Sequence, residues 1–119
     1  MRTSSLLAIA ATTAALFYIA LGSGGPQVSW PRIQDINDPH IQDLGRSAVA
    51  WDNEVRPTDN LTFDRVTHGE KRMVTGGVQY HLWVFATGSD GYIDDYDTLV
   101  TEDPSTNTRT VSFFRRWMF

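Results

Sequence analysis

Four aspartates close together form the densest group of candidate metal ligands in the chain. They fall within residues 90–97, as Asp90, Asp94, Asp95 and Asp97. A calcium loop needs the spacing D-x-D-x-D-G with a Glu at a fixed later position, and this segment has neither. A turn followed by a solvated strand face explains these carboxylates better. We therefore expect no metal site.

The three histidines are the other side chains that could support acid–base chemistry. His40, His68 and His81 fall at the start of an expected helix and on two different expected strands. Catalysis needs a nucleophile or an acid–base pair held together in a pocket, so we expect each imidazole to be exposed or half-buried rather than catalytic. The glycines of residues 22–25 open no strand–helix unit that could bind a phosphate. We expect neither enzyme activity nor a cofactor.

Composition excludes several further classes of protein. The 119 residues include no cysteine, which excludes thiol catalysis, disulfide bonds and iron–sulfur ligation. Ten Lys and Arg against fourteen Asp and Glu give a net charge of −4. An acidic chain is a poor candidate for nucleic acid, because neutralising phosphates dominates that affinity. The length suits one compact domain.

Residues 1–22 have the layout of a secretory signal peptide. An apolar run over residues 6–21 follows a single cation, and the small residues Ala20 and Gly22 stand where cleavage before Ser23 requires them. The run is shorter than the roughly 20 apolar residues of a membrane span. We expect this segment to be removed and the remainder to be secreted, with the vacuole or the endoplasmic reticulum as alternatives and no membrane association afterwards.

Asn60 opens a glycosylation acceptor triplet, Asn60-Leu61-Thr62. The triplet has meaning only if the chain enters the secretory pathway. It lies where one expected element ends and the next begins, which favours exposure.

One helix is expected after Asn37. Asp38 can cap the free backbone N–H groups of the first turn, and Pro39 suits the first helical position. Arg56-Pro57 ends the pattern. Gly45 costs roughly 1 kcal/mol relative to Ala inside a helix, so it is expected to mark a close approach to a sheet. Apolar residues recur at helical spacing, as Ile41, Leu44, Ala48 and Val55.

After Pro57 the apolar period changes from 3.6 to 2, which is typical of strands. Residues 78–86 alternate strictly, with one wholly apolar face. Phe63 and Val66 differ in parity within their strand, which predicts a bulge. Further strands are expected over a short stretch at 30–35 and over 61–74, 92–102 and 108–116, with turns at Gly76-Gly77, Ser89-Asp90-Gly91 and Asp103–Asn107. The fold class is therefore α+β.

Three connections are expected at one edge of this sheet. Alternate turns of an antiparallel meander lie at the same end, so Thr75-Gly76 and Pro104-Ser105 should be neighbours. The segment before Trp30 could join them. Three adjacent segments make a wedge that could fill a groove, and the alternative is three ordinary connections.

Several segments resemble the plant cystatins, inhibitors of papain-like cysteine proteases. Residues 44–53 read LGRSAVAWDN beside the family's helix signature L-A-R-F-A-V-x-E-H-N. The resemblance continues in WPRI at 30–33, LTF at 61–63, VQYHL at 78–82 and VSF at 111–113. It covers about residues 28–117 and implies one α-helix packed across a four- to five-stranded antiparallel sheet.

The resemblance implies a flexible trunk over residues 23–29 before a cystatin domain over 30–117. In the family, a trunk glycine, a Q-x-V-x-G hairpin and a Pro-Trp hairpin enter the protease cleft without being cleaved. The chain would then act as a reversible inhibitor, monomeric or as a domain-swapped dimer. The matching protease-binding positions are Gly24, Gly25, Val28, Ser29, Arg72, Met73, Val74, Thr75, Gly76, Pro104 and Ser105.

The contact residues depart from the family pattern. Arg72 replaces the glutamine, Ser105 replaces the tryptophan, and Ser47 replaces a helix phenylalanine. Losing a buried aromatic anchor often costs about 2–4 kcal/mol, which is roughly thirty- to a thousand-fold in affinity. We expect weaker inhibition or a shifted target. The alternatives are a cystatin-fold protein that binds another partner and, more distantly, a secreted storage or structural protein.

Overall fold

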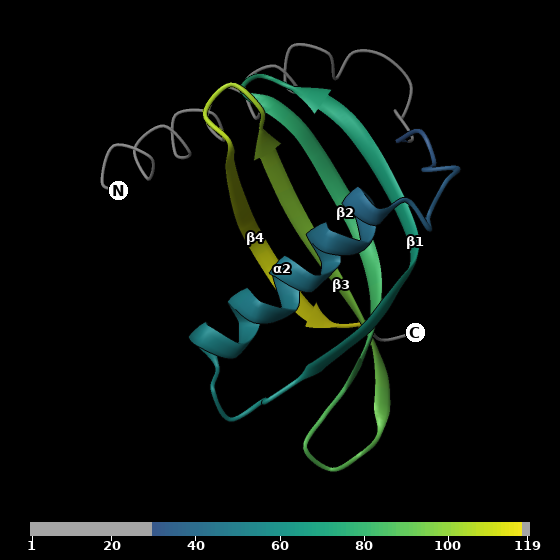
Figure 1. Ribbon diagram of the computed structural model, residues 1–119, viewed down its shortest axis with the longest axis vertical. Helices are drawn as coiled ribbons and strands as arrows, with labels where there is room; N and C mark the ends of the chain where they lie inside the picture. The colour runs from purple at the N-terminus through teal and green to yellow at the C-terminus, as the bar shows by residue number, and fades with distance from the viewer. Residues whose placement is uncertain (1–29, 118–119) are drawn as a thin grey trace, which may run out of the picture.

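The computed structural model describes residues 30–117 (Figure 1). Helix α2 (Pro39–Val55) crosses one face of a four-stranded antiparallel sheet of strand order β1-β2-β3-β4. The strands are β1 (Thr62–Val74), β2 (Gly77–Thr87), β3 (Ile93–Asp103) and β4 (Thr108–Arg116). The expected α+β fold, a helix across an antiparallel meander, is confirmed. Within the described part, no helix has the length and apolar character needed to cross a membrane.

Helix α2 begins and ends where the sequence predicts. The carboxylate of Asp38 accepts a hydrogen bond from the backbone N–H of His40 at 2.9 Å, and Pro39 is the first helical residue. At the other end the Arg56 N–H donates to the Asp52 carbonyl at 2.7 Å, directly before Pro57. The Asp38 cap satisfies one of the free N–H groups of the first turn, and Pro57 cannot continue the helix.

Gly45 lies where the helix comes into close contact with the sheet. A Cβ built on it would collide with Cγ2 of Val66 and lie 3.0 Å from the ring of Phe63. The predicted close approach is confirmed, and only glycine fits there without a shift. The core lies between the helix and this face of the sheet. It comprises Ile41, Leu44, Ala48, Val49, Leu61, Val66, Tyr80, Leu82, Val84, Ala86, Tyr96, Val100 and Phe114.

Strand β1 is irregular, as the parity of its apolar residues predicts. The register against β2 shifts between Phe63 and Arg65 and again between Val66 and His68. A further shift between Leu99 and Val100 interrupts the pairing of β3 with β4. Bulges increase local twist, and the sheet curves around the helix (Figure 1).

The prediction of a short strand over residues 30–35 is wrong. This segment makes one isolated bridge, between Arg32 and Glu70. The Lys71 N–H donates to the Pro31 carbonyl at 3.0 Å, and the Ile33 N–H donates to the Gly69 carbonyl at 2.9 Å. Pro31 has no N–H to return the first bond, so the ladder stops after these contacts and the sheet has four strands.

Candidate functional site

The two predicted hairpin turns lie at the same end of the sheet (Figure 1). Thr75-Gly76 joins β1 to β2, and residues 104–107 join β3 to β4. Val78 pairs with Glu102 next to both turns, and a Cβ on Gly77 would collide with the Glu102 carbonyl oxygen. Gly76 and Gly77 have φ of 91° and 145°, where side chains are disfavoured. The expected juxtaposition of the turns is therefore confirmed.

The segment before the helix approaches the same end. Because Pro31 bonds to Lys71 and Ile33 to Gly69 in antiparallel order, Trp30 lies beside Arg72, on the side of the first turn. The Arg72 guanidinium carbon lies 4.2 Å from the centroid of the Trp30 ring. The trunk positions Gly24, Gly25, Val28 and Ser29, together with the expected signal segment, fall outside the described residues.

Arg72 is held within the sheet. Its Nε and Nη2 donate to Oε1 of Gln79 at 3.0 and 2.9 Å, and its guanidinium stacks on Trp30. Burial lowers the pKa of the Arg72 guanidinium from its usual value. Its charge is therefore engaged by residues of its own chain, which the sequence did not predict.

The first turn presents a different apolar side chain. Met73 is 76% exposed, whereas Val74 is half-buried. Thr75 and Gly76 are exposed at the tip. The tip therefore combines one large apolar side chain with a glycine-rich backbone.

The second turn is stabilised by its own side chains. Oδ1 of Asp103 accepts bonds from the Ser105 backbone N–H at 2.9 Å and from the Ser105 hydroxyl at 2.7 Å. The Ser105 hydroxyl bond is the main cause that lowers the pKa of Asp103 below its usual value. Asn107 has φ of 55°, a conformation that asparagine tolerates in turns. Pro104 and Ser105 are both exposed.

Ser47, in place of the family's phenylalanine, links the helix to β4. Its hydroxyl accepts a bond from Nη1 of Arg109 at 2.8 Å, and the same nitrogen contacts Asp43 at 2.8 Å. Arg109 also pairs with Glu102 at 3.0 Å. Trp83 cannot fill space beside Ser47, because it packs against His68, His81 and Trp117, on the sheet face away from the helix.

The histidines lie as expected, but one aspartate does not. His40 is exposed and bonds Glu102 at 2.7 Å, and His68 is half-buried. The prediction that Asp97 lies on a solvated strand face is wrong. Its side chain is fully buried. His81 contacts one carboxylate oxygen at 2.9 Å, and Arg115 contacts the other at 3.0 Å.

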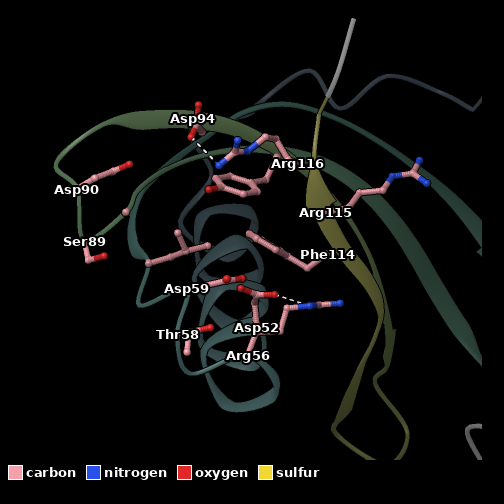
Figure 2. Close-up of a pocket in the computed structure, with 13 residues that line it drawn as sticks. Asp52, Arg56, Thr58, Asp59, Ser89, Asp90, Asp94, Phe114, Arg115 and Arg116 are labelled. Atoms are coloured by element: carbon pink, nitrogen blue, oxygen red, sulfur yellow. Dashed lines mark hydrogen bonds and ion pairs between the residues drawn. The ribbon is translucent and has the colours of Figure 1, made fainter.

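The opposite end of the molecule carries a pocket of about 450 Å³ that the sequence did not predict. Figure 2 shows its walls, from the end of α2, the loop before β1, the β2–β3 turn and the end of β4. Asp52 is 1% exposed and pairs with Arg56 at 2.5 Å. First burial and then the neighbouring Asp59 raise the pKa of Asp52 to about 6. Within residues 30–117, no three His, Asp or Glu side chains are arranged to hold a metal.

Comparisons with known proteins agree with this fold. A family model described as "Aspartic acid proteinase inhibitor" matches residues 33–117. A rice protein named cysteine proteinase inhibitor 6 is 43% identical over 86 residues, covering 71% of this chain and 75% of the relative. Another, cysteine proteinase inhibitor 8, is 39% identical over 110 residues, covering 92% and 88%.

A solved structure confirms the architecture independently of close sequence similarity. The salivary cystatin of the soft tick Ornithodoros moubata superposes with a TM-score of 0.64 at 17% identity, covering 78% of this chain and 100% of the cystatin. The helix, the four-stranded meander and the relatives at 39–43% identity lead to one assignment. The chain belongs to the plant cystatin family.

Proposed function

We propose that this protein is a secreted, reversible inhibitor of papain-like cysteine proteases. Residues 23–29 and the two hairpin turns would enter the protease cleft together. The observation that carries the proposal is the placement of Thr75-Gly76 beside residues 104–107, with Trp30 stacked on Arg72 next to the first turn. The names of the rice relatives support the protease class.

The turns suit this role because their shape is set before binding. Asp103 holds the second turn through two bonds to Ser105, and the first turn spans only two residues between paired strands. A preorganised surface avoids much of the ordering cost of association. The edge can therefore bind without the mobility that a cleavable substrate loop needs.

The residues at the proposed contact edge predict protease inhibition of moderate strength. Arg72 is engaged by Trp30 and Gln79, and Ser105 provides no aromatic anchor. We assign the main apolar contact to Met73, which is 76% exposed at the first turn. Inhibition is then expected at low micromolar or nanomolar concentration.

The test is a titration of papain with residues 23–119, which contain every described element. The expected result is competitive inhibition, with an inhibition constant at least tenfold weaker for Met73→Ala. Met73 lies on an exposed tip, so this substitution should leave the fold intact. A folded protein without effect on papain at 10 μM would refute inhibition of this class and favour a cystatin-fold protein that binds another partner.

Aspartic proteases are a second candidate target. The matching family model carries that description over residues 33–117, and Arg72 and Ser105 depart from the cysteine-protease pattern. A parallel titration of pepsin discriminates the two. Inhibition of pepsin alone would assign the protein to that target, and its absence would leave papain-like enzymes.

We further propose export with a glycan on Asn60. Asn60 is exposed with φ of 45°, in the connection between α2 and β1. This connection lies away from the Thr75-Gly76 and Pro104-Ser105 turns (Figure 1). A glycan there would leave the proposed inhibitory edge free. Expression in a eukaryotic secretory host should yield a product that loses mass on treatment with an amidase that releases N-glycans, and Asn60→Gln should abolish that loss.

A further inference from the structure

The pocket at the end of α2 contains a buried oxygen without a donor. Oδ1 of Asp52 accepts from Arg56 at 2.5 Å, but Oδ2 is buried and has no hydrogen-bond partner among residues 30–117. A buried acceptor left without a donor loses its hydration and gains nothing in return. Such groups usually indicate a proton, a water or a ligand that completes them.

The side chain that adjoins the Asp52 carboxyl group is another acceptor. Figure 2 shows the carboxyl groups of Asp52 and Asp59 next to each other, and the two are in hydrogen-bond contact. Two ionised carboxylates have only acceptor sites, so they need a donor between them. A proton can supply it in acid, where the raised pKa of Asp52, about 6, keeps one of them neutral. Above that pH the donor has to come from elsewhere.

The charges around the pocket favour a cation. Arg56 pairs with Asp52, and Arg116 pairs with Asp94 at 3.2 Å. The third lining arginine, Arg115, pairs with Asp97, on the sheet face away from the helix. Asp59 and Asp90 then have no ion pair within residues 30–117 and leave a negative excess.

The same pocket accommodates an alkyl chain. Leu61 and Phe114 form part of its lining, and its volume of about 450 Å³ exceeds what a single ammonium group fills. A donor with several N–H groups on an aliphatic stem matches carboxylates beside the small apolar surfaces of Leu61 and Phe114, which are 8% and 4% exposed. A lysine side chain or a small amine has this chemistry.

We propose that this pocket binds the ammonium group of an aliphatic amine at the adjoining carboxyl groups of Asp52 and Asp59. The amine is either a free molecule or a lysine side chain on a partner. Asp90, on the β2–β3 turn, is placed to attract a second ammonium of a diamine. The site lies at the end of the sheet away from the Thr75-Gly76 and Pro104-Ser105 turns, so it is separate from the proposed inhibitory edge.

The test is an NMR titration of ¹⁵N-labelled residues 23–119 at pH 7.5. The probes are 1-aminopentane, 1,5-diaminopentane and N-acetyl-lysine methylamide, with 1-pentanol as the uncharged control. Saturable shifts confined to amides such as Asp59, Gly88 and Asp90 are expected for the amines, and none for pentanol. Equal binding of the lysine derivative and aminopentane would identify a partner's side chain as a source. Preference for the free diamine would identify a small molecule.

Two variants decide whether the pocket carboxylates are responsible. Asp59→Asn should weaken binding at least tenfold, whereas Asp35→Asn, an equal charge change on an exposed residue before the helix, should leave it unchanged. Asp90→Asn, on an exposed turn, should weaken the diamine more than aminopentane. Lowering the pH from 7.5 to 5 should also weaken binding, because a proton then occupies the carboxyl pair. Shifts that do not saturate, or that persist in Asp59→Asn, would overturn the proposal.

Discussion

Ser105 is the single residue that most limits the proposed inhibitory edge. It stands on an exposed turn where the family has an anchoring tryptophan, and its hydroxyl donates to Asp103. Ser105→Trp should therefore tighten inhibition of papain by about tenfold or more, since buried aromatic anchors contribute about 2–4 kcal/mol. The inhibition constant is the measurement. Thr106→Trp, one position further along the turn, is the control, and an equal gain in both would indicate nonspecific apolar contact.

The raised pKa of Asp52 predicts how the free energy of unfolding depends on pH. Its pKa in the folded protein, about 6, lies above the ordinary value of 3.8, because burial and then Asp59 disfavour its charge. The folded state therefore holds this proton more tightly than the unfolded state, so this contribution falls as pH rises from about 4 to 6. One pKa unit corresponds to about 1.4 kcal/mol, which gives a loss of up to about 3 kcal/mol.

Asp59→Asn isolates that effect. The asparagine amide can donate to Oδ2 of Asp52 and removes the neighbouring charge, so the decline in stability between pH 4 and 6 should shrink. At pH 7.5 the variant should be more stable than the parent by about 1–2 kcal/mol. Urea unfolding at several pH values measures this. Asp64→Asn, at an exposed residue of β1, is the matched control. An unchanged pH dependence of stability in Asp59→Asn would contradict a role of Asp59 in raising the pKa of Asp52.

At the scale of elements, Gly45 sets the distance between α2 and the sheet. Gly45→Ala gains up to about 1 kcal/mol of helix propensity, but its Cβ would collide with Val66. Overpacking costs typically about 1–3 kcal/mol, so a net loss of stability is expected in chemical unfolding. In a Val66→Ala background the same substitution should cost less. An equal cost in both backgrounds would show that another contact is responsible.

Arg72 adds a side-chain contact to the backbone bonds that fix the segment before α2 to the sheet. Arg72→Gln removes the stack on Trp30 and both bonds to Gln79. The Lys71 N–H, which donates to Pro31, should then exchange with deuterium at least threefold faster. Arg65→Gln, which removes the stack on Phe85 at 5.8 Å, is the control. Unchanged exchange at Lys71 would mean that the backbone bonds alone fix the segment.

Apart from the strand expected over residues 30–35, the helix and strands were predicted to within about a residue because their signals are local. The Asp38-Pro39 start, the Gly76-Gly77 turn and the alternation in β2 each depend on neighbours in sequence. Burial of Asp97 was not predictable, because its partners His81 and Arg115 come from the strands on either side. The pocket was missed for the same reason, since its carboxylates come from α2, the loop after it, the β2–β3 turn and β3.

At the scale of the whole molecule, the hairpin edge and the amine pocket lie at opposite ends of one sheet (Figure 1). Distant sites without shared partners usually combine additively, within about 0.5 kcal/mol. Asp59→Asn should therefore leave the papain inhibition constant unchanged, alone and combined with Ser105→Trp. Its effect on unfolding free energy should also be equal in both backgrounds. A deviation above about 1 kcal/mol in either measurement would show that the sheet couples its two ends, and binding of an amine would then alter protease inhibition.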